Sequence, residues 1–575
     1  MNAPTPKAPK PGGLDNRLTG AEAMVRMLER HGVSHIFGLC GDTSLPFYDA
    51  LKRLDHGMRH VLTRDERSAA YMADAYARVT GRVGVCEGPS GGGATYILPG
   101  VVEANESSIP ILAITTDIAT SSRGRFTLTE LDQAALFRPL AKWNRVIERG
   151  SMLPGLVRQA FTEMTSGRPG AAHLAFPYDV QREPVEEPEL WADAALGRYP
   201  ARRTGPDPAA IAAAAAALAS AKRPIVICGG GVVIAGAEPE LKALAERLGA
   251  PVATTISGQG SIPDNHPLAL GVVGSNGGTP ETREVVDAAD LVLFIGCRAG
   301  SVTTERWRHP KPGTRILHID VDPRVIGACY PTEVAVQGDA KLALAALGRA
   351  LAERTTKANG IGPQAVAEAK RRKFEAFRAL AQSDERPIRP ERVVAALNKL
   401  LPEDAVLVCD PGTPCPYFSA YFEWRTTGRQ FISNRAHGAL GYALPAVAGA
   451  QIGRPGKKCV AVMGDGSFAM ACGEMETFLR EKLPVTFIVL SNSSFGWIKA
   501  GQRAGFDRRY FSVDFGRTDH ARVAEAFGLK AWRVEDPAGL ERALGQALAA
   551  EGPSLVDIVT QPLEEAQAPV SEWIA

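Results

Sequence analysis

The sequence predicts an α/β protein made of three doubly wound parallel-sheet domains, and three observations point to this class. Short apolar runs, typical of buried strands, alternate with stretches of helical periodicity along the chain. These runs fall into three blocks separated by Pro-rich or charged segments. The length of 575 residues suits about three or four domains. Strands that alternate with helices form parallel sheets covered on both faces.

Each block supplies four strand-like runs. We place the domains at residues 19–187, 205–353 and 375–562, after a Pro-rich tail at 1–18 that we expect to be disordered. The final residues, 563–575, are predicted to form a tail or a lid. The expected strands are 35–40, 83–88, 109–115 and 171–176 in the first block, 224–231, 251–255, 291–297 and 315–323 in the second, and 405–410, 459–466, 485–492 and 554–559 in the third.

The composition of the chain argues against several classes of protein. The net charge is +2 with both signs interspersed, so nothing indicates a nucleic-acid-binding surface. The nine cysteines are scattered, several of them inside apolar runs, which is typical of buried thiols in a reducing compartment. The first residues lack the apolar core of a signal peptide, and no run of about 18 uncharged apolar residues indicates a membrane span. We therefore expect a soluble, cytoplasmic protein that acts on small molecules.

A carboxylate between two glycines ends one strand of the third block. Asp465 lies in the sequence Gly464-Asp465-Gly466-Ser467, and the apolar spacing that follows predicts a helix whose N-terminus faces this loop. Ligands of doubly wound sheets bind outside the carboxyl ends of the strands, and helix N-termini favour phosphate. A carboxylate at such a place is explained if Mg²⁺ lies between the protein and a phosphate group. Alone, the motif is more typical of a tight turn.

A second oxygen ligand is predicted at the end of the next strand. Asn492 follows Asp465 by 27 residues, which is one strand–helix–strand step. Its amide oxygen and the Ser494 carbonyl complete a plausible set of protein ligands for the same cation. Alone, Asn492 is a turn asparagine, but the joint spacing favours the metal site.

This pattern resembles the thiamine-diphosphate motif of thiamine-diphosphate-dependent enzymes. The family usually has two adjacent asparagines, and here the first is Ser491. The resemblance implies a pyrimidine-binding, a central nucleotide-binding-like and a diphosphate-binding domain, in that order. It also implies cofactor contacts from Gly412, Thr413, Gly438, Leu440, Gly464, Asp465, Gly466, Ser467, Asn492, Phe495 and Gly496.

The family's catalytic glutamate matches Glu66. This residue would hydrogen-bond the aminopyrimidine ring from the first domain of a partner chain, with a pKa raised by burial. Without the resemblance, it is an ordinary first-turn glutamate of a helix. Leu440 matches the apolar side chain beneath the bent cofactor, with the Gly438 carbonyl facing the ring; otherwise it is a core leucine.

Nearly the whole chain is most similar to the acetolactate-synthase-like group. Residues 128–143, 250–271 and 316–323 carry this similarity. The group includes acetohydroxyacid synthases, glyoxylate carboligase, oxalyl-CoA decarboxylase, 2-hydroxyacyl-CoA lyases and benzaldehyde lyase. It implies a carboligase or decarboxylase that acts on 2-oxo acids or aldehydes, as a homodimer or homotetramer. A 2-hydroxyacyl-CoA lyase or an acyl-CoA decarboxylase stays open, whereas the presence of Glu66 argues against a non-catalytic cofactor-binding protein.

The substrate-reading positions depart from acetohydroxyacid synthases. Thr129 replaces an expected glutamine, and Gly501 replaces an expected tryptophan. Asp42 either lies near the active centre or caps the next helix. Phe495 and Trp497 either form the wall of the substrate pocket or belong to the core. His437 either transfers protons or is a packed or surface histidine. The central domain is left open to FAD, ADP or the nucleotide end of a CoA thioester.

Overall fold

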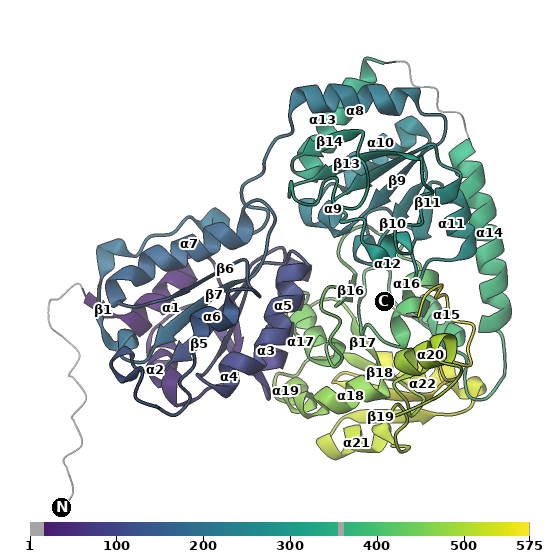
Figure 1. Ribbon diagram of the computed structural model, residues 1–575. Helices are drawn as coiled ribbons and strands as arrows, with labels where there is room; N and C mark the ends of the chain where they lie inside the picture. The colour runs from purple at the N-terminus through teal and green to yellow at the C-terminus, as the bar shows by residue number, and fades with distance from the viewer. Residues whose placement is uncertain (1–16, 355–360, 574–575) are drawn as a thin grey trace, which may run out of the picture.

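Three six-stranded parallel sheets, each covered by helices on both faces, form the architecture of the computed structural model (Figure 1). The predicted fold class is therefore confirmed. The structure describes residues 17–354 and 361–573. The first sheet lies apart on one side, while the central and third sheets lie one above the other and are joined along their edge by the long helix α14 (Ile361–Ala381).

The first sheet has the strand order β3-β2-β4-β5-β7-β6. Its strands are β2 (His35–Gly38), β3 (Arg59–Leu62), β4 (Gly84–Gly88), β5 (Ile111–Asp117), β6 (Trp143–Val146) and β7 (Ala172–Pro177). Helices α1 (Gly20–Arg30), α2 (Leu45–Arg53) and α7 (Leu153–Thr165) contribute to the apolar core on one face, and α3 (Glu66–Thr80) and α5 (Leu98–Glu106) to that on the other. A capping box of Thr19 and Glu22 starts α1, and Gly81, at φ +66°, ends α3.

The ends of the first domain are held together by a short antiparallel pair. Strand β1 (Arg17–Thr19) pairs with β8 (Pro184–Glu186). The predicted disordered tail at 1–18 lies outside the described residues except for its last two, and these two belong to β1.

The central sheet has the order β11-β10-β9-β12-β13-β14. Its strands are β9 (Pro224–Cys228), β10 (Val252–Thr254), β11 (Ala269–Val272), β12 (Leu291–Ile295), β13 (Arg315–Asp320) and β14 (Val334–Gln337). Helices α8 (Pro208–Ser220), α10 (Glu238–Leu248) and α13 (Ala340–Ala352) share one apolar core with it, while α11 (Pro280–Asp287) and α14 pack on the other face.

The third sheet has the order β16-β15-β17-β18-β20-β19. Its strands are β15 (Val406–Cys409), β16 (Phe431–Ser433), β17 (Cys459–Gly464), β18 (Thr486–Ser491), β19 (Lys530–Val534) and β20 (Ser554–Val559). One face is covered by α15 (Pro390–Leu400), α16 (Pro414–Tyr421) and α22 (Leu540–Leu548), and the other by α17 (Ala443–Gly453), α19 (Met475–Arg480) and α21 (His520–Phe527).

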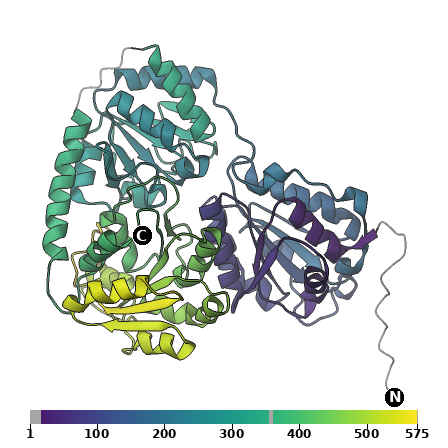
Figure 2. The ribbon, with the colours of Figure 1, turned by 180° about the vertical axis from the view of Figure 1, so that it is seen from behind.

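Helices α3 and α17 join the first and third sheets. Their buried side chains belong to one apolar core that runs from β4 and β5 to β17 and β18. Both views of the molecule show the two helices side by side at this junction (Figures 1 and 2). The relative position of the two sheets is therefore fixed by packing rather than by a flexible linker.

One predicted helix is interrupted. The single helix expected after Asp465 is instead α18 (Asp465–Ala471), a 3-10 turn, η8 (Cys472–Glu474), and α19. The break occurs where the Glu474 carboxylate turns inward and accepts bonds from the Arg64 amide (3.2 Å) and the Thr477 hydroxyl (2.6 Å). In the described parts of the chain, no helix combines the length and apolarity needed to cross a bilayer.

Candidate active site

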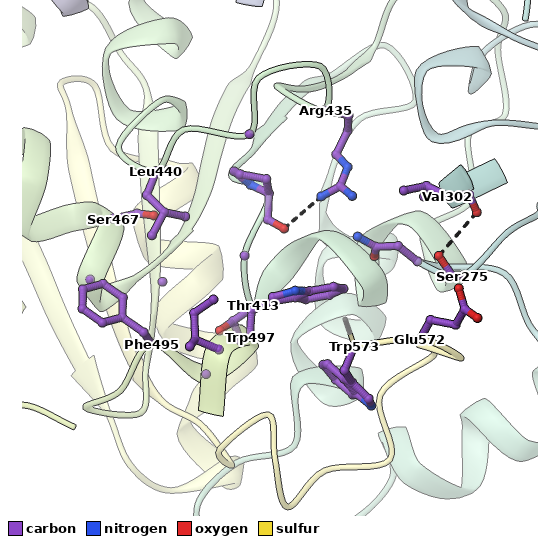
Figure 3. Close-up of a pocket in the computed structure, with 18 of the residues that line it drawn as sticks. Ser275, Val302, Thr413, Arg435, Leu440, Ser467, Phe495, Trp497, Glu572 and Trp573 are labelled. Atoms are coloured by element: carbon purple, nitrogen blue, oxygen red, sulfur yellow. Dashed lines mark hydrogen bonds between the residues drawn. The ribbon is translucent and has the colours of Figure 1, made fainter. Parts of the chain in front are cut away.

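A cavity of about 340 Å³ lies at the carboxyl ends of β15, β16, β17 and β18. Figure 3 shows its wall, with Leu440, Ser467 and Phe495 on one side, Trp573 and Glu572 on the other and Trp497 between them. The sequence-predicted residues that line it are Gly412, Thr413, His437, Gly438, Leu440, Gly464, Asp465, Gly466, Ser467, Ser494, Phe495, Gly496 and Trp497.

Asp465 and Asn492 come together as the sequence spacing requires. One carboxylate oxygen of Asp465, Oδ2, accepts the backbone N–H of Asn492 (2.9 Å) and of Ser493 (2.6 Å), while Oδ1 accepts that of Gly466 (3.0 Å). Ser493 adopts φ +57°, which turns the chain back at this point. Burial raises the pKa of Asp465, and the backbone bonds to Ser493 and Asn492 oppose the shift.

Asn492 lies directly behind the cavity wall. Its Oδ1 accepts the backbone N–H of Ser494 (3.2 Å). Its Nδ2 is buried and has no hydrogen-bond partner among the described residues. Nδ2 is a hydrogen-bond donor, so an acceptor such as a phosphate oxygen would satisfy it.

Two glycines allow the loops to approach closely. A Cβ on Gly466 would lie 2.7 Å from Cε1 of Phe495, and one on Gly496 would lie 3.2 Å from both Asn492 Nδ2 and Thr413 Oγ1. Any side chain at these positions would displace residues that line the cavity. The glycines therefore set the shape of the site.

The buried carboxylate of Asp410 binds the end of the loop that carries Leu440. Gly438 and Gly441 have φ +74° and +82°, so the backbone turns sharply on both sides of Leu440. Asp410 Oδ1 accepts the N–H groups of Tyr442 and Ala443, both at 3.0 Å. Burial raises the pKa of Asp410 to about 6.

The central domain and the C-terminal tail complete the cavity. Eleven further lining residues were not predicted as site residues: Ser275, Asn276, Ser301, Val302, Arg306, Pro411, Arg435, Ala436, Ile498, Glu572 and Trp573. The Trp573 ring packs against Trp497 with centroids 5.1 Å apart, and Glu572 lies 3.5 Å from Arg306. The tail is bound to the central domain by Gly277 N–H to Pro569 O (2.9 Å) and Ser571 N–H to Ser275 O (3.0 Å). The tail thus lies over the cavity, at the place a lid would take.

Besides Asn492, three predicted site residues do not line this cavity, and all three lie in the first domain. Glu66 is the first residue of α3 and is 7% exposed, packed against the backbone of Gly88 and Gly93. Burial is the largest cause of its raised pKa. Thr129, at φ +70°, pairs its hydroxyl with Ser90 (2.7 Å).

Asp42 is the third of these residues. It is exposed and begins the 3-10 turn η1 (Asp42–Ser44). The N-cap of α2 is Ser44, so the alternative in which Asp42 caps this helix is wrong.

A buried glutamate beside Glu66 was not predicted from the sequence. Glu87, on β4, is fully buried and accepts hydrogen bonds from Tyr48 Oη and, at 3.3 Å, His60 Nε2. The residue that follows it, Gly88, contacts the Glu66 side chain. Burial raises the pKa of Glu87. The available signal was an acidic residue inside an otherwise apolar strand.

A second cavity, of about 430 Å³, lies at the carboxyl ends of the central sheet. The glycine-rich loops after β9 and β12 form part of its wall, and Gly231 N–H donates to Gly296 O at 3.1 Å. Burial raises the pKa of the lining residue Asp320 to about 6. Five arginines also line it: Arg168, Arg202, Arg203, Arg298 and Arg435. Three carboxylates line it as well, those of Glu106, Asp320 and Asp339, and two of them pair with Arg298 and Arg203. Because the arginines outnumber the carboxylates, the lining suits an anionic ligand.

Three family models match the chain. They are the N-terminal TPP binding domain (residues 18–136), the central domain (211–347) and the C-terminal TPP binding domain (410–558) of the thiamine pyrophosphate enzymes. The chain is 35% identical to the probable acetolactate synthase large subunit of Methanococcus aeolicus, over 95% of this chain and 92% of the relative. It is 32% identical to the acetolactate synthase isozyme 3 large subunit of Escherichia coli (strain K12), over 92% of each chain. It is also 32% identical to the acetolactate synthase of Arthrospira platensis, over 94% of each.

Proposed function

The chain belongs to the thiamine pyrophosphate enzymes, which use thiamine diphosphate, and from this premise we propose that it is a magnesium-dependent carboligase of the acetolactate-synthase-like group. Its substrates in this proposal are 2-oxo acids or aldehydes, whose carbon–carbon bonds it forms or cleaves. The observation that carries the proposal is the convergence of Asp465, Asn492 and Ser494 beside one cavity, which Asp465 and Ser494 line and behind which Asn492 lies.

These three residues fit a hard divalent cation. Backbone N–H groups use three of the roughly four lone-pair directions of the Asp465 carboxylate, so one remains for a metal. The Asn492 amide oxygen and the Ser494 carbonyl are also oxygen ligands, which Mg²⁺ prefers. Gly412, Thr413 and Ser467 would hold the diphosphate next to this cation.

Thiamine diphosphate, when bound, supplies the carbon nucleophile of the reaction. Leu440 would support the bent cofactor, because the turns at Gly438 and Gly441, both at positive φ, present its side chain at the cavity wall. The Gly438 carbonyl would accept a hydrogen bond from the ring. Phe495 and Trp497 would exclude water from the reacting atoms, and His437 would hold or release a proton at the mouth of the cavity.

Glu66 would hold the proton that activates the cofactor. Its burial favours the protonated carboxyl, which can donate a hydrogen bond to a ring nitrogen. Since Glu66 does not line the cavity of its own chain, we assign it to the cavity of a second copy. Asp42 and Thr129, in the same domain, would approach that cavity as well. A homodimer, or a tetramer built from dimers, follows from this assignment.

A second candidate is a 2-hydroxyacyl-CoA lyase or an acyl-CoA decarboxylase. The five arginines of the second cavity favour it, since the nucleotide end of CoA is strongly anionic. FAD or ADP would satisfy the same charges. A yellow protein would favour FAD, and retention on a CoA column would favour the thioester.

Binding and turnover together test the proposal. Isothermal titration of the cofactor-free protein with thiamine diphosphate should show binding with Mg²⁺ and little binding after chelation. Incubation with 2-oxo acids, aldehydes and 2-hydroxyacyl-CoAs, followed by mass spectrometry, identifies the substrates. Magnesium-independent cofactor binding, or no product from any of these compounds, would contradict the proposal.

A further inference from the structure

A glutamate of the first domain reaches the loop that carries Leu440. Glu103, on α5, is fully buried, and its Oε2 accepts the backbone N–H groups of His437 (2.7 Å) and Ala436 (3.2 Å). These two residues line the cavity and precede Leu440 by only a few positions. The contact joins positions 333 and 334 residues apart in the sequence, across the junction of the first and third sheets.

The other oxygen of Glu103 is held by its own domain. Arg78 Nη2 and Ser107 Oγ donate to Glu103 Oε1 at 3.1 and 2.6 Å. Arg78 also donates through Nε to Asp74 Oδ2, at 2.9 Å. Both Arg78 and Asp74 lie on α3 and are buried, so the three charged groups form one network shielded from water.

The same network contacts the loop on the far side of Leu440. The Tyr442 hydroxyl donates to Asp74 Oδ2. Tyr442 is fully buried and packs edge-on against Tyr71 of α3, with ring centroids 5.0 Å apart. The first domain therefore holds the loop both before Leu440, through Glu103, and after it, through Asp74. Between these two anchors the loop carries Gly438 and Leu440.

We propose that Glu103 is a positioning residue for the cofactor, which it reaches through the Ala436–Gly438 backbone and Leu440. This inference rests on the proposed function, because it takes Leu440 and Gly438 as contacts of thiamine diphosphate. The carboxylate fixes two N–H groups that would otherwise have to be satisfied by water, and so it fixes the loop in one conformation. Arg78 in turn fixes the carboxylate.

The informative variant is Glu103→Gln. An amide keeps the size of the side chain, but its NH₂ group must face either the loop N–H groups or Arg78, all of which are donors. One of the two sets of bonds is therefore lost. The dissociation constant for thiamine diphosphate in the presence of Mg²⁺ should rise by about tenfold to a hundredfold, the range expected for a lost charge-assisted bond.

The control is Glu391→Gln. Glu391 is also fully buried in a helix, α15, but neither of its carboxylate oxygens has a hydrogen-bond partner among the described residues. It does not line the cavity. This variant should leave the dissociation constant of the cofactor unchanged. Tyr442→Phe, which removes only a hydroxyl group, serves as a milder second variant and should raise the constant severalfold.

A double-mutant cycle separates positioning from a general loss of stability. Cofactor affinity is measured for Glu103→Gln, Leu440→Ala and the double variant. If Glu103 acts through Leu440, the glutamine substitution should weaken binding far less in the Leu440→Ala background than in the parent protein. Additive losses would overturn the inference, and so would an unchanged affinity of both Glu103→Gln and Tyr442→Phe. Failure of the parent protein itself to bind thiamine diphosphate would instead refute the proposed function.

Discussion

The substitution Gly449→Ala, at the contact between α3 and α17, is predicted to destabilise the protein. A Cβ on Gly449 would lie 1.9 Å from the carbonyl oxygen of Met72 on α3. Carbon–oxygen contacts in proteins are normally about 3.3 Å or longer, so the two helices would have to separate by more than about 1 Å. The obstructing atom belongs to backbone, so no side-chain rotation relieves the collision.

Two opposed effects set the change in the free energy of unfolding that Gly449→Ala should cause. Alanine in place of glycine stabilises a helix by about 1 kcal/mol. Overpacking a buried contact costs about 1–3 kcal/mol, and occasionally more, and a backbone collision belongs at the upper end of this range. We therefore expect Gly449→Ala to lower the free energy of unfolding by about 2 kcal/mol.

The matched control is Gly545→Ala, in α22 of the same domain. A Cβ at Gly545 meets no atom within 4 Å, so only the gain in helix stability of about 0.5–1 kcal/mol should remain. Scanning calorimetry of both variants should thus shift the first unfolding transition in opposite directions. Because α17 follows the loop that carries Leu440, Gly449→Ala should also weaken binding of thiamine diphosphate, whereas Gly545→Ala should not. A Gly449→Ala protein that melts at or above the control would refute the reasoning.

Four further predictions concern individual groups. Asp465→Ala should abolish magnesium-dependent binding of thiamine diphosphate in isothermal titration, and retained binding would exclude its role as a ligand. Glu66→Gln should keep the cofactor bound but lower kcat by several orders of magnitude, and normal turnover would refute its assignment. Asp410 holds its proton up to about pH 6 in the folded state, so its contribution to stability is complete below about pH 4 and is lost as the pH rises through 6. Asp410→Asn should remove about 2–3 kcal/mol of this decline between pH 4 and 8 in chemical unfolding, and an unchanged pH profile would contradict the raised pKa. Trp573→Ala should open the cavity beside Trp497 and raise the KM for substrate more than it lowers kcat, whereas an unchanged KM would argue against the tail as a cover.

The sequence predicted the inner strands of each sheet and missed the outer ones. All twelve expected runs correspond to the four inner strands of the three sheets, while β3, β6, β11, β14, β16 and β19 lie at the sheet edges. An inner strand of a covered parallel sheet is buried on both faces, so it reads as an uninterrupted apolar run, as Leu291–Ile295 does. An edge strand such as Arg59–Leu62 is partly exposed and carries polar side chains, so it resembles a loop.

The site residues also fall into two groups, those that follow inner strands and could be predicted, and those that are placed by domain packing and could not. Asp465 and Asn492 follow inner strands, and the carboxyl ends of parallel strands meet at one edge of a sheet, so their spacing alone brought them together. Arg306 and Trp573 reach the cavity from the central domain and from the tail, through contacts that no periodicity encodes. Their places depend on how whole domains pack, which is set by surfaces such as that between α3 and α17.

Glu103 shows most clearly what such packing adds. In the sequence it is one acidic residue in a short helix, no different from the many glutamates that face water. Its burial is possible only because Arg78, one helix away, supplies a compensating charge, and because a loop from the third sheet supplies two N–H groups. An acidic side chain kept away from water in this way is costly unless every partner is in place. The folded arrangement therefore makes the position of the Leu440 loop depend on the first domain, and this dependence is what the double-mutant cycle measures.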